Sequence, residues 1–303
     1  MDTQTSDKKP EVRVRPEPKG NPLLFRVCAA ISAILGIAGA VLYFFAYVND
    51  YEPGIMHFRT GSYLILIAGG LIAGSALSAL VAGIASRGTG AARKIEFPGA
   101  SAVFFTFLPG LLFAAYVVSV LVTSRGLPEG VLAKIALVAA ALSAAAMILR
   151  ATTWGSGVGG SILSLFPAVF TGLLIFIYYF DMTTAPINSP EKGMTNVLLS
   201  IALLFFLGDS RDRLGKISPV LAVFTRIAAA FITLPVAAAR VILRFTSQLE
   251  SPPFIVNALL ISVGLFALYL LVLTGRAIRA GKPEAGPESE DEPIIQSDTE
   301  QKG

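Results

Sequence analysis

Hydrophobic residues along the chain are collected into eight long runs that polar segments separate. Each run is continuous and rich in alanine and leucine, unlike the period-two alternation of a membrane β-strand. A bilayer core about 30 Å thick needs about 20 apolar residues in a helix. The pattern therefore predicts an all-α, polytopic transmembrane bundle of about eight spans. The expected spans are Val27–Val48, Thr60–Ser86, Phe97–Ser124, Val131–Leu149, Ser161–Phe180, Gly193–Gly208, Ile217–Leu243 and Pro253–Gly275.

The second run, Thr60–Ser86, contains no charged side chain and repeats a small residue at every fourth position. On a helix, such positions form a ridge where another backbone can come close. We expect helix packing through this ridge, which consists of Gly70, Gly74, Ser78 and Ala82. Similar ladders occur in the first run (Ser32, Gly36, Ala40) and in the fourth (Ala136, Ala140, Ala144), so the first, second and fourth spans are expected to pack together.

Polar tails flank the membrane domain, for which we expect residues 22–279. Residues 1–21 read as a disordered basic tail and residues 280–303 as a disordered acidic one. Eight spans place both tails on one side, and most of the 24 Lys and Arg residues fall on that side. Because cytoplasmic loops carry such an excess, both termini are expected to be cytoplasmic. Gly193–Gly208 is the shortest run, and seven spans would move the C-terminus to the other side.

The amino-acid composition limits the kinds of partner and cofactor that we expect. The chain is 54% hydrophobic and 15% charged, well below the charge content of soluble domains, and its net charge is +4. The cationic loops account for this charge, so nucleic acid is not expected as a partner. The lipid bilayer is the expected partner, with anionic lipid a second one for the basic tail. One cysteine, Cys28, and one histidine, His57, exclude the usual Cys/His metal sites, and we expect no cofactor.

Three expected spans contain a proline, at Pro109, Pro167 and Pro235. Proline removes a backbone donor and tends to kink a helix. Such kinks serve as hinges or open cavities in some transporters, whereas in other membrane proteins they only shape the packing. The sequence leaves both interpretations open.

Two polar segments could carry chemistry. The letters of Gly155–Gly160 match a dinucleotide-binding loop, but that motif needs a preceding strand, and membrane spans flank it here. The segment Asn49–Arg59 holds Asp50, Tyr51, Glu52, His57 and Arg59. It lacks a second set of catalytic partners, so a solvated loop with some ion pairing is the simpler interpretation. No catalytic residue is assigned.

Ionisable residues inside the spans are the remaining candidates, because charge within a membrane usually has a function. We assign Lys134 and Arg226 to the membrane and find no Asp or Glu within a span. Arg240 lies near the end of its run and is counted with the loop that follows. Lys134 can reach back to the interface. Arg226 lies nine residues from the start of its span, so it either reaches the cytoplasmic interface or, with Thr225 and Asn257, contacts a ligand or lipid.

One resemblance adds to this picture. Tyr51-Glu52-Pro53-Gly54, His57-Phe58 and Gly61-Ser62, together with Arg211-Asp212-Arg213-Leu214-Gly215, resemble segments of uncharacterised multi-span membrane proteins of bacteria. The resemblance implies a location in the bacterial cytoplasmic membrane. It implies no activity and no site.

We therefore expect an integral membrane protein and carry two main hypotheses for it. The first is a permease-like transporter of a small molecule, which predicts a polar cavity near mid-membrane lined by Arg226, Thr225 and Asn257. The second is a non-catalytic scaffold or assembly partner, which predicts tight apolar packing there and a homo-oligomer or membrane partner. A membrane-embedded enzyme is less consistent with the sparse polar residues.

Overall fold

The computed structural model describes residues 21–52, 54–55, 57–59, 61–87, 100–153, 162–163, 165–180, 189–213, 219–246 and 253–280. The predictions for the basic tail (residues 1–20), the acidic tail from residue 281 and the glycine-rich segment Gly155–Gly160 lie outside these residues. So do Pro53 and the segment 214–218, which contribute to the resemblance noted above.

The described residues confirm an all-α transmembrane bundle. They form α1 (Pro22–Asp50), α2 (Leu64–Ala85), α3 (Ala100–Thr123), α4 (Val131–Thr153), α6 (Leu165–Phe180), α7 (Pro190–Arg213), α8 (Pro219–Ala228), the π-helix η1 (Ala229–Thr233), α9 (Leu234–Phe245) and α10 (Phe254–Ala280). The segment α8–η1–α9 is one continuous span, so seven spans are long and apolar enough to cross a membrane. The eighth hydrophobic helix, α6, has 16 residues. Two short strands, β1 (Tyr51–Glu52) and β2 (His57–Phe58), pair between α1 and α2.

The prediction that Gly193–Gly208 is the shortest span is wrong. Helix α7 has 24 residues and begins at Pro190. With α8–η1–α9 counted as one span, the shortest of the eight hydrophobic segments is α6. The span predicted from hydropathy ended before the charged residues on either side of it. Two of these residues, Glu191 and Asp209, are buried and lie within α7. The expectation that no Asp or Glu lies within a span is therefore also wrong.

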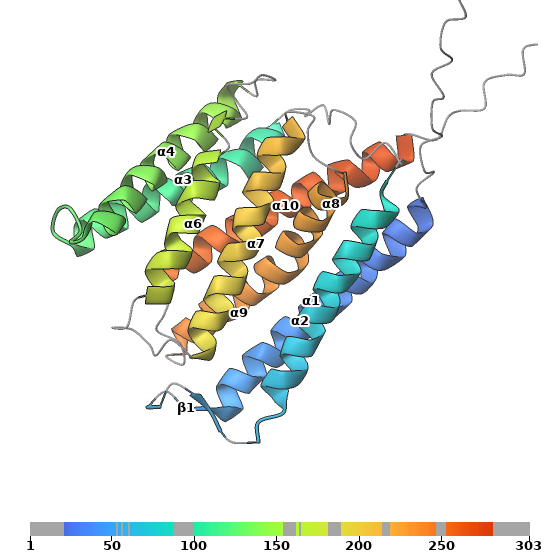
Figure 1. Cartoon of the computed structure of the whole chain (residues 1–303), viewed down its shortest axis with the longest axis horizontal. Helices are drawn as coiled ribbons and strands as arrows, with labels where there is room; N and C mark the ends of the chain where they lie inside the picture. Colours follow the sequence, from blue (N-terminus) through green and yellow to red (C-terminus); the bar gives the residue numbers. More distant parts are fainter. Residues whose placement is uncertain are drawn as a thin grey trace, which may run out of the picture.

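Helices α7, α8–η1–α9 and α10 form the centre of the molecule (Figure 1). The α1–α2 pair packs on one side, against α8 and α9, and α3, α4 and α6 lie on the other side, against α10 and α7. The start of α1 and the end of α10 lie at the same end of the bundle, which we call the tail end. The strands β1 and β2 lie at the opposite end, which we call the hairpin end.

Helices α1 and α2 pack closely, as predicted. Ser32 Oγ bonds to the Ser75 carbonyl at 3.0 Å, and Ser75 Oγ donates to the Ser32 carbonyl at 2.8 Å. Such interhelical bonds hold helices together in lipid, where the hydrophobic effect contributes little. The inward face of α2 is formed by Ala68, Ile72, Ser75, Ala79, Ala82 and Gly83.

The four predicted ridge positions differ in their surroundings. Ala82 is buried, and Ser78 Oγ donates to the Cys28 carbonyl at 2.8 Å. A Cβ at Gly74 would lie 3.3 Å from Leu35, whereas one at Gly70 would have nothing within 4 Å.

The fourth span does not join this pair, contrary to the prediction. Helix α4 packs chiefly against α3 and α6. Its alanine ladder is buried there instead, at Ala136, Ala140 and Ala144. A ladder of small residues therefore marked a buried face correctly but did not identify the neighbouring helix.

The central span α8–η1–α9 is the most heavily buried of all, and its α-helix is interrupted by the π-helix. Pro235 has no N–H with which to bond the Phe231 carbonyl in the α-helical register. That carbonyl points at α1, because a Cβ added at Gly36 would lie 1.9 Å from Phe231 O. On the other side, a Cβ at Gly264 of α10 would lie 2.6 Å from Leu234 Cβ. Two glycines therefore let α1 and α10 press against the backbone of the interrupted region.

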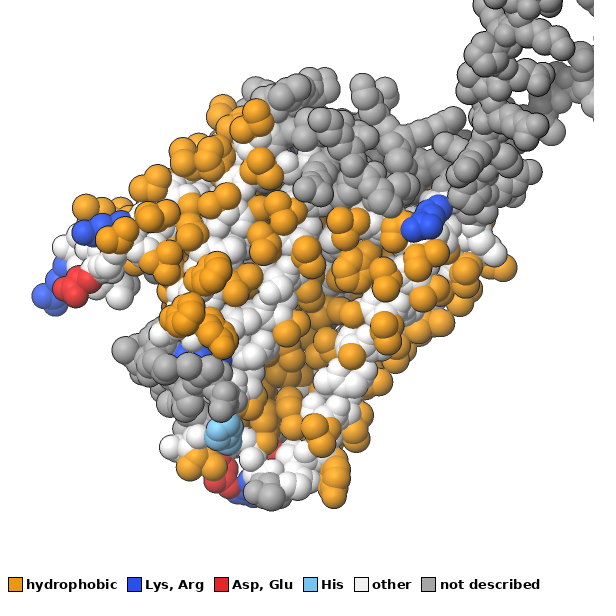
Figure 2. All heavy atoms as spheres, viewed as in Figure 1, with side chains coloured by type: hydrophobic (Ala, Val, Ile, Leu, Met, Phe, Trp, Pro, Cys, Tyr) orange, Lys and Arg blue, Asp and Glu red, His pale blue; other side chains and the backbone are white. Residues whose placement is uncertain are grey.

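Apolar side chains cover the flank of the bundle, while charged side chains gather toward its ends (Figure 2). Every spanning helix exposes large hydrophobic side chains, such as Ile34 on α1, Leu66 on α2 and Val122 on α3. Their exposure is what contact with lipid requires. The chain is a multi-pass integral membrane protein.

The contact at Gly36 gives the first test. In Gly36→Ala, the new methyl group cannot fit against Phe231 O, so the helices must move apart. Overpacking of this kind costs about 1–3 kcal/mol, and we expect a lower melting temperature for the purified protein in detergent. Gly70→Ala is the matched control, because its methyl group meets nothing and alanine favours the helix. Equal melting of Gly36→Ala and the parent would contradict the contact.

Candidate functional site

At the hairpin end, Arg240 of α9 is completely buried and lies near polar side chains of α1 and α7. Its Nη2 donates to Thr195 Oγ1 of α7 at 2.8 Å. Thr195 in turn donates to the Glu191 carbonyl one turn earlier, at 2.7 Å. We call Arg240, Thr195, Glu191, Tyr43, Tyr47 and Tyr51 the Arg240 cluster.

Three tyrosines form the second wall of the Arg240 cluster. Tyr43 and Tyr47 lie one turn apart on one face of α1, and Tyr51 begins β1 directly after that helix. Their successive ring centroids are 4.7 and 4.6 Å apart. Both Tyr43 and Tyr47 lie within electrostatic reach of Arg240 and Glu191. The two hydroxyls also interact with each other, but neither makes a hydrogen bond of good geometry to a residue that the structure describes.

The strands β1 and β2 close the hairpin end over these tyrosines. Tyr51 of β1 donates its hydroxyl to Glu191 Oε1 at 2.5 Å. The ring of Phe58, on β2, packs edge-on against Tyr47 at 4.9 Å between centroids. The segment expected to be a solvated loop therefore forms a cap with a buried side. Its solvent side carries the exposed ion pair of Arg59 and Glu52, with Nε–Oε1 at 2.8 Å, and the exposed His57.

Asn257 of α10 lies at the level of Arg240. The close contact between Gly264 of α10 and Leu234 of α9 shows which parts of the two helices lie at the same level. Asn257 is seven residues from Gly264, and Arg240 is six residues from Leu234. Since α9 and α10 are packed together and both distances run toward the hairpin end, each residue lies about 10 Å beyond that contact. Asn257 is fully buried, and neither its Oδ1 nor its Nδ2 bonds to any described residue.

A second polar cluster lies at the tail end, around Arg150 and Asp209. Arg150 of α4 holds the Asp209 carboxylate of α7 in a bidentate ion pair, with Nη2–Oδ1 at 3.0 Å and a shorter contact from Nη1 to Oδ2. The guanidinium of Arg150 also lies over the Phe266 ring of α10, 4.9 Å from its centroid. We group Arg150 and Asp209 with Arg226 and Thr274, which are also buried toward the tail end, under the name Arg150 cluster. Its ion pair ties the α3–α4–α6 side to the central helices.

The structure does not bring the three predicted contact residues together. Arg226 is buried at the tail end, where Nη1 donates to Thr274 Oγ1 of α10 at 2.9 Å. Thr225 donates to the Ala222 carbonyl of its own helix at 3.1 Å. Asn257 lies 17 residues before Thr274 on α10, which is about 26 Å along the helix. Arg226 and Asn257 therefore belong to opposite ends.

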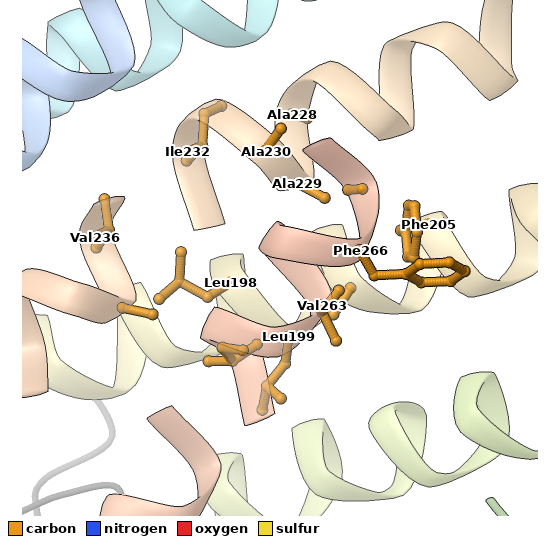
Figure 3. Packing of buried hydrophobic residues seen from close by; sticks show 14 of the residues in the cluster. Leu198, Leu199, Phe205, Ala228, Ala229, Ala230, Ile232, Val236, Val263 and Phe266 are labelled. Carbon is orange, nitrogen blue, oxygen red and sulfur yellow. The ribbon is translucent and has the colours of Figure 1, made fainter. Parts of the chain in front are cut away.

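Apolar side chains fill the layer between the two clusters (Figure 3). Around η1 this layer contains Leu198, Leu199, Phe205, Ile232, Val236, Val263 and Phe266, each almost fully buried. The rings of Phe205 and Phe266 meet edge-on at 5.6 Å between centroids. Tight apolar packing at mid-membrane is what the scaffold hypothesis predicted. The mid-membrane cavity lined by Arg226, Thr225 and Asn257, which the transporter hypothesis predicted, is not formed, because Arg226 and Asn257 lie toward opposite ends.

Buried charge is distributed alike at the two ends of the bundle. Among the described residues, the buried charged side chains are Lys192, Arg240 and Glu191 at the hairpin end, and Arg150, Arg226 and Asp209 at the tail end. The described part of each end therefore contributes two buried cations and one buried carboxylate. The described residues contain no group of three or more His, Cys, Asp or Glu side chains placed to hold a metal ion.

Sequence reasoning missed most of these residues. Arg240 was counted with a loop because it lies near the end of its span, and Glu191 and Asp209 were placed outside the membrane for the same reason. The spacing of the tyrosines at the end of α1 could have predicted an inward-facing aromatic surface. The packing of α1, α7, α9 and α10 against one another could not be predicted from the sequence, because it depends on tertiary structure.

No protein-family model, curated protein or solved structure matches the chain. The functional argument therefore rests on the geometry of the two clusters.

The buried ion pair gives a direct test. Asp209→Asn leaves the Arg150 charge buried without its counter-charge, which typically costs about 3–5 kcal/mol. We expect a large fall in the melting temperature of the purified protein. Replacing both partners, as in Arg150→Leu with Asp209→Leu, should recover part of this loss.

Glu52→Gln provides the matched control for Asp209→Asn. It breaks the exposed Arg59–Glu52 pair, and exposed pairs contribute about 0–1 kcal/mol. Similar melting temperatures for Asp209→Asn and Glu52→Gln would show that the Arg150–Asp209 pair is not buried as described.

Proposed function

We propose that the protein is a permease-like transporter of a small anionic molecule. The observation that carries the proposal is the pair of buried arginines on the central span, Arg226 before η1 and Arg240 after it. They are 14 residues apart, about 21 Å along the helix, and each lies in a polar cluster at a different end. A charge at membrane depth is costly and commonly marks a substrate or ion path.

The two arginines support an anion as the substrate. An anion that crosses the bundle would meet a guanidinium toward either end of its path, at Arg226 and at Arg240.

The interrupted helix supports movement between the two ends. π-Helical turns frequently occur at functional sites, and transporters commonly use discontinuous helices near mid-membrane. In this proposal the apolar layer around η1 is the closed barrier of an occluded state. Alternating access would open one end of the bundle at a time, with the other end closed.

A scaffold or assembly partner is the second candidate, and the tight apolar layer favours it. In a scaffold, that layer stays closed and the two clusters serve only to fix the packing of the helices. The two candidates differ in whether water reaches the clusters in alternation.

We further propose that the protein resides in the cytoplasmic membrane of a bacterium with its tail end inside. The excess of Lys and Arg in the segments on that side supports the orientation. The basic tail would then face the anionic lipids of the inner leaflet.

Cysteine accessibility in vesicles tests transport against scaffolding. The single native cysteine makes Cys28→Ala a simple background, into which Asn257→Cys or Thr274→Cys is introduced. A membrane-impermeant methanethiosulfonate reagent is added from either side. A transporter predicts that Asn257→Cys reacts from the hairpin side and Thr274→Cys from the tail side, because each end opens in turn.

Two controls on the same background calibrate the labelling. Ala267→Cys lies on α10 between the two test positions, is fully buried, and should stay unreactive. Leu127→Cys lies in the exposed turn between α3 and α4 and should react readily. If Asn257→Cys and Thr274→Cys react no faster than Ala267→Cys, transport is wrong and the scaffold candidate stands.

A further inference from the structure

We propose that the bundle consists of two rigid units that rock against each other about the contact between Leu234 and Gly264. The first, which we call the α1 unit, contains α1, α2, α8, η1 and α9 with the strands β1 and β2. The second, the α10 unit, contains α3, α4, α6, α7 and α10. This inference rests on the proposed transport function, because it names the parts whose movement would open the two ends in turn.

Contacts between backbones hold the α1 unit together. Helices α1 and α2 are joined by the reciprocal serine bonds described above. Helix α8 meets both of them, because a Cβ at Gly83 of α2 would lie 2.5 Å from Val220 O, and one at Gly36 of α1 would lie 1.9 Å from Phe231 O. Val220 and Phe231 are eleven residues apart, about 16 Å along the span. A helix pressed against its neighbours at two such distant points cannot tilt away from them, so we expect α8 to move with α1 and α2.

An ion pair and a group of aromatic rings hold the α10 unit together. The buried pair of Arg150 and Asp209 joins α4 to α7, and breaking such a pair typically costs about 3–5 kcal/mol. Phe113 of α3 packs against Phe170 of α6 and Phe206 of α7, at 5.3 and 6.1 Å between ring centroids. These contacts are costly to separate, and they all lie within one unit.

Hydrogen bonds between side chains join the two units at each end. At the tail end, Arg226 donates to Thr274 Oγ1 at 2.9 Å, which we call the tail latch. At the hairpin end, Arg240 donates to Thr195 Oγ1 at 2.8 Å, and the cap adds the bond of Tyr51 described above. We call these two bonds the hairpin latch. In all three bonds the donor belongs to the α1 unit and the acceptor to the α10 unit. Water can replace either partner when an end opens, so the net cost of breaking one such bond is only about 0.5–3 kcal/mol.

The contact of Leu234 with Gly264 lies between the two latches. A Cβ at Gly264 would be 2.6 Å from Leu234 Cβ, so the two units touch closely there. Thr274 lies ten residues from Gly264, about 15 Å toward the tail end, and Arg240 lies six residues from Leu234, about 9 Å toward the hairpin end. A tilt about this contact that separates the units at one end therefore presses them together at the other.

Distances between nitroxide labels, measured by double electron–electron resonance in phosphatidylcholine nanodiscs, test the proposal. Pairs of exposed residues are replaced by cysteine in the Cys28→Ala background. Arg87→Cys with Arg276→Cys reports the separation of the units at the tail end, and Tyr63→Cys with Gly193→Cys reports it at the hairpin end. A tilt of about 15°, acting about 15 Å from the pivot, changes such a separation by about 4 Å.

Two matched variants weaken one latch each. Thr274→Val keeps the shape of the side chain but removes the oxygen that accepts from Arg226. It should raise the ratio of tail-open to tail-closed molecules about 10- to 100-fold, so that a tail distance longer by about 4 Å appears while the hairpin distance does not lengthen. Thr195→Val should produce the reverse, with lengthening at the hairpin end alone. Tyr51→Phe removes the other bond of the hairpin latch and replaces Thr195→Val if that variant does not fold.

Controls separate rocking from general loosening of the bundle. Thr171→Val removes a buried hydroxyl that bonds to carbonyl groups of its own helix, α6, so neither distance should change. Two further cysteine pairs measure distances inside one unit. They are Tyr63→Cys with Phe245→Cys in the α1 unit, and Leu127→Cys with Gly193→Cys in the α10 unit. Both internal distances should stay constant in every variant.

Three results would overturn the proposal. The first is a change in the distances inside a unit as large as the change between units. The second is unchanged distances in all three latch variants, and the third is lengthening of both ends together in a single variant.

The same measurements distinguish this inference from the proposed transport. If Asn257→Cys and Thr274→Cys are labelled in alternation while distances inside a unit change, transport stands and the division into these two units is rejected. If the distances change as expected but neither cysteine reacts faster than Ala267→Cys, the two units stand and transport is rejected.

Discussion

The contact of backbone with backbone around the central span is the constraint from which the rest of the structure follows. Pro235 leaves the Phe231 carbonyl without its α-helical donor, and the helix passes into a π-turn just before it. Gly36 lets α1 come up to that carbonyl, and Gly264 lets α10 close from the other side. Lipid offers no water to bond an exposed carbonyl, so an interrupted helix of this kind is stable only where protein covers it.

This packing also decides where charge can lie. The centre has room only for small and apolar side chains, so the ionisable residues of the central span are displaced toward its two ends. There they meet residues of α7 and α10, which supply Thr195 and Thr274 as partners. The molecule is therefore built as two polar clusters separated by an apolar layer. Such an arrangement can open at either end without a continuous polar path between them.

Hydropathy and composition sufficed to predict the class of fold and the positions of the spans, because an apolar run in lipid has few alternatives to a helix. They failed at the ends of α7, where burial and pairing keep Glu191 and Asp209 inside the helix. They also failed for Arg240, which stands near the end of its run. The sequence predicted only in part which helices pack against one another. The small-residue ladders marked buried faces on α1 and α4, but the closest approach on α1 proved to involve α9 and η1 as well as α2.

A cryo-electron-microscopy structure of the chain in lipid nanodiscs, at a resolution that shows side chains, tests the central claim most directly. We predict a π-turn at Ala229–Thr233, the Phe231 carbonyl in contact with Gly36, and apolar side chains filling the layer between Arg226 and Arg240. A regular α-helix through that region, with side chains between α1 and the central span, would contradict the account. So would a continuous polar passage joining the two arginines in one conformation.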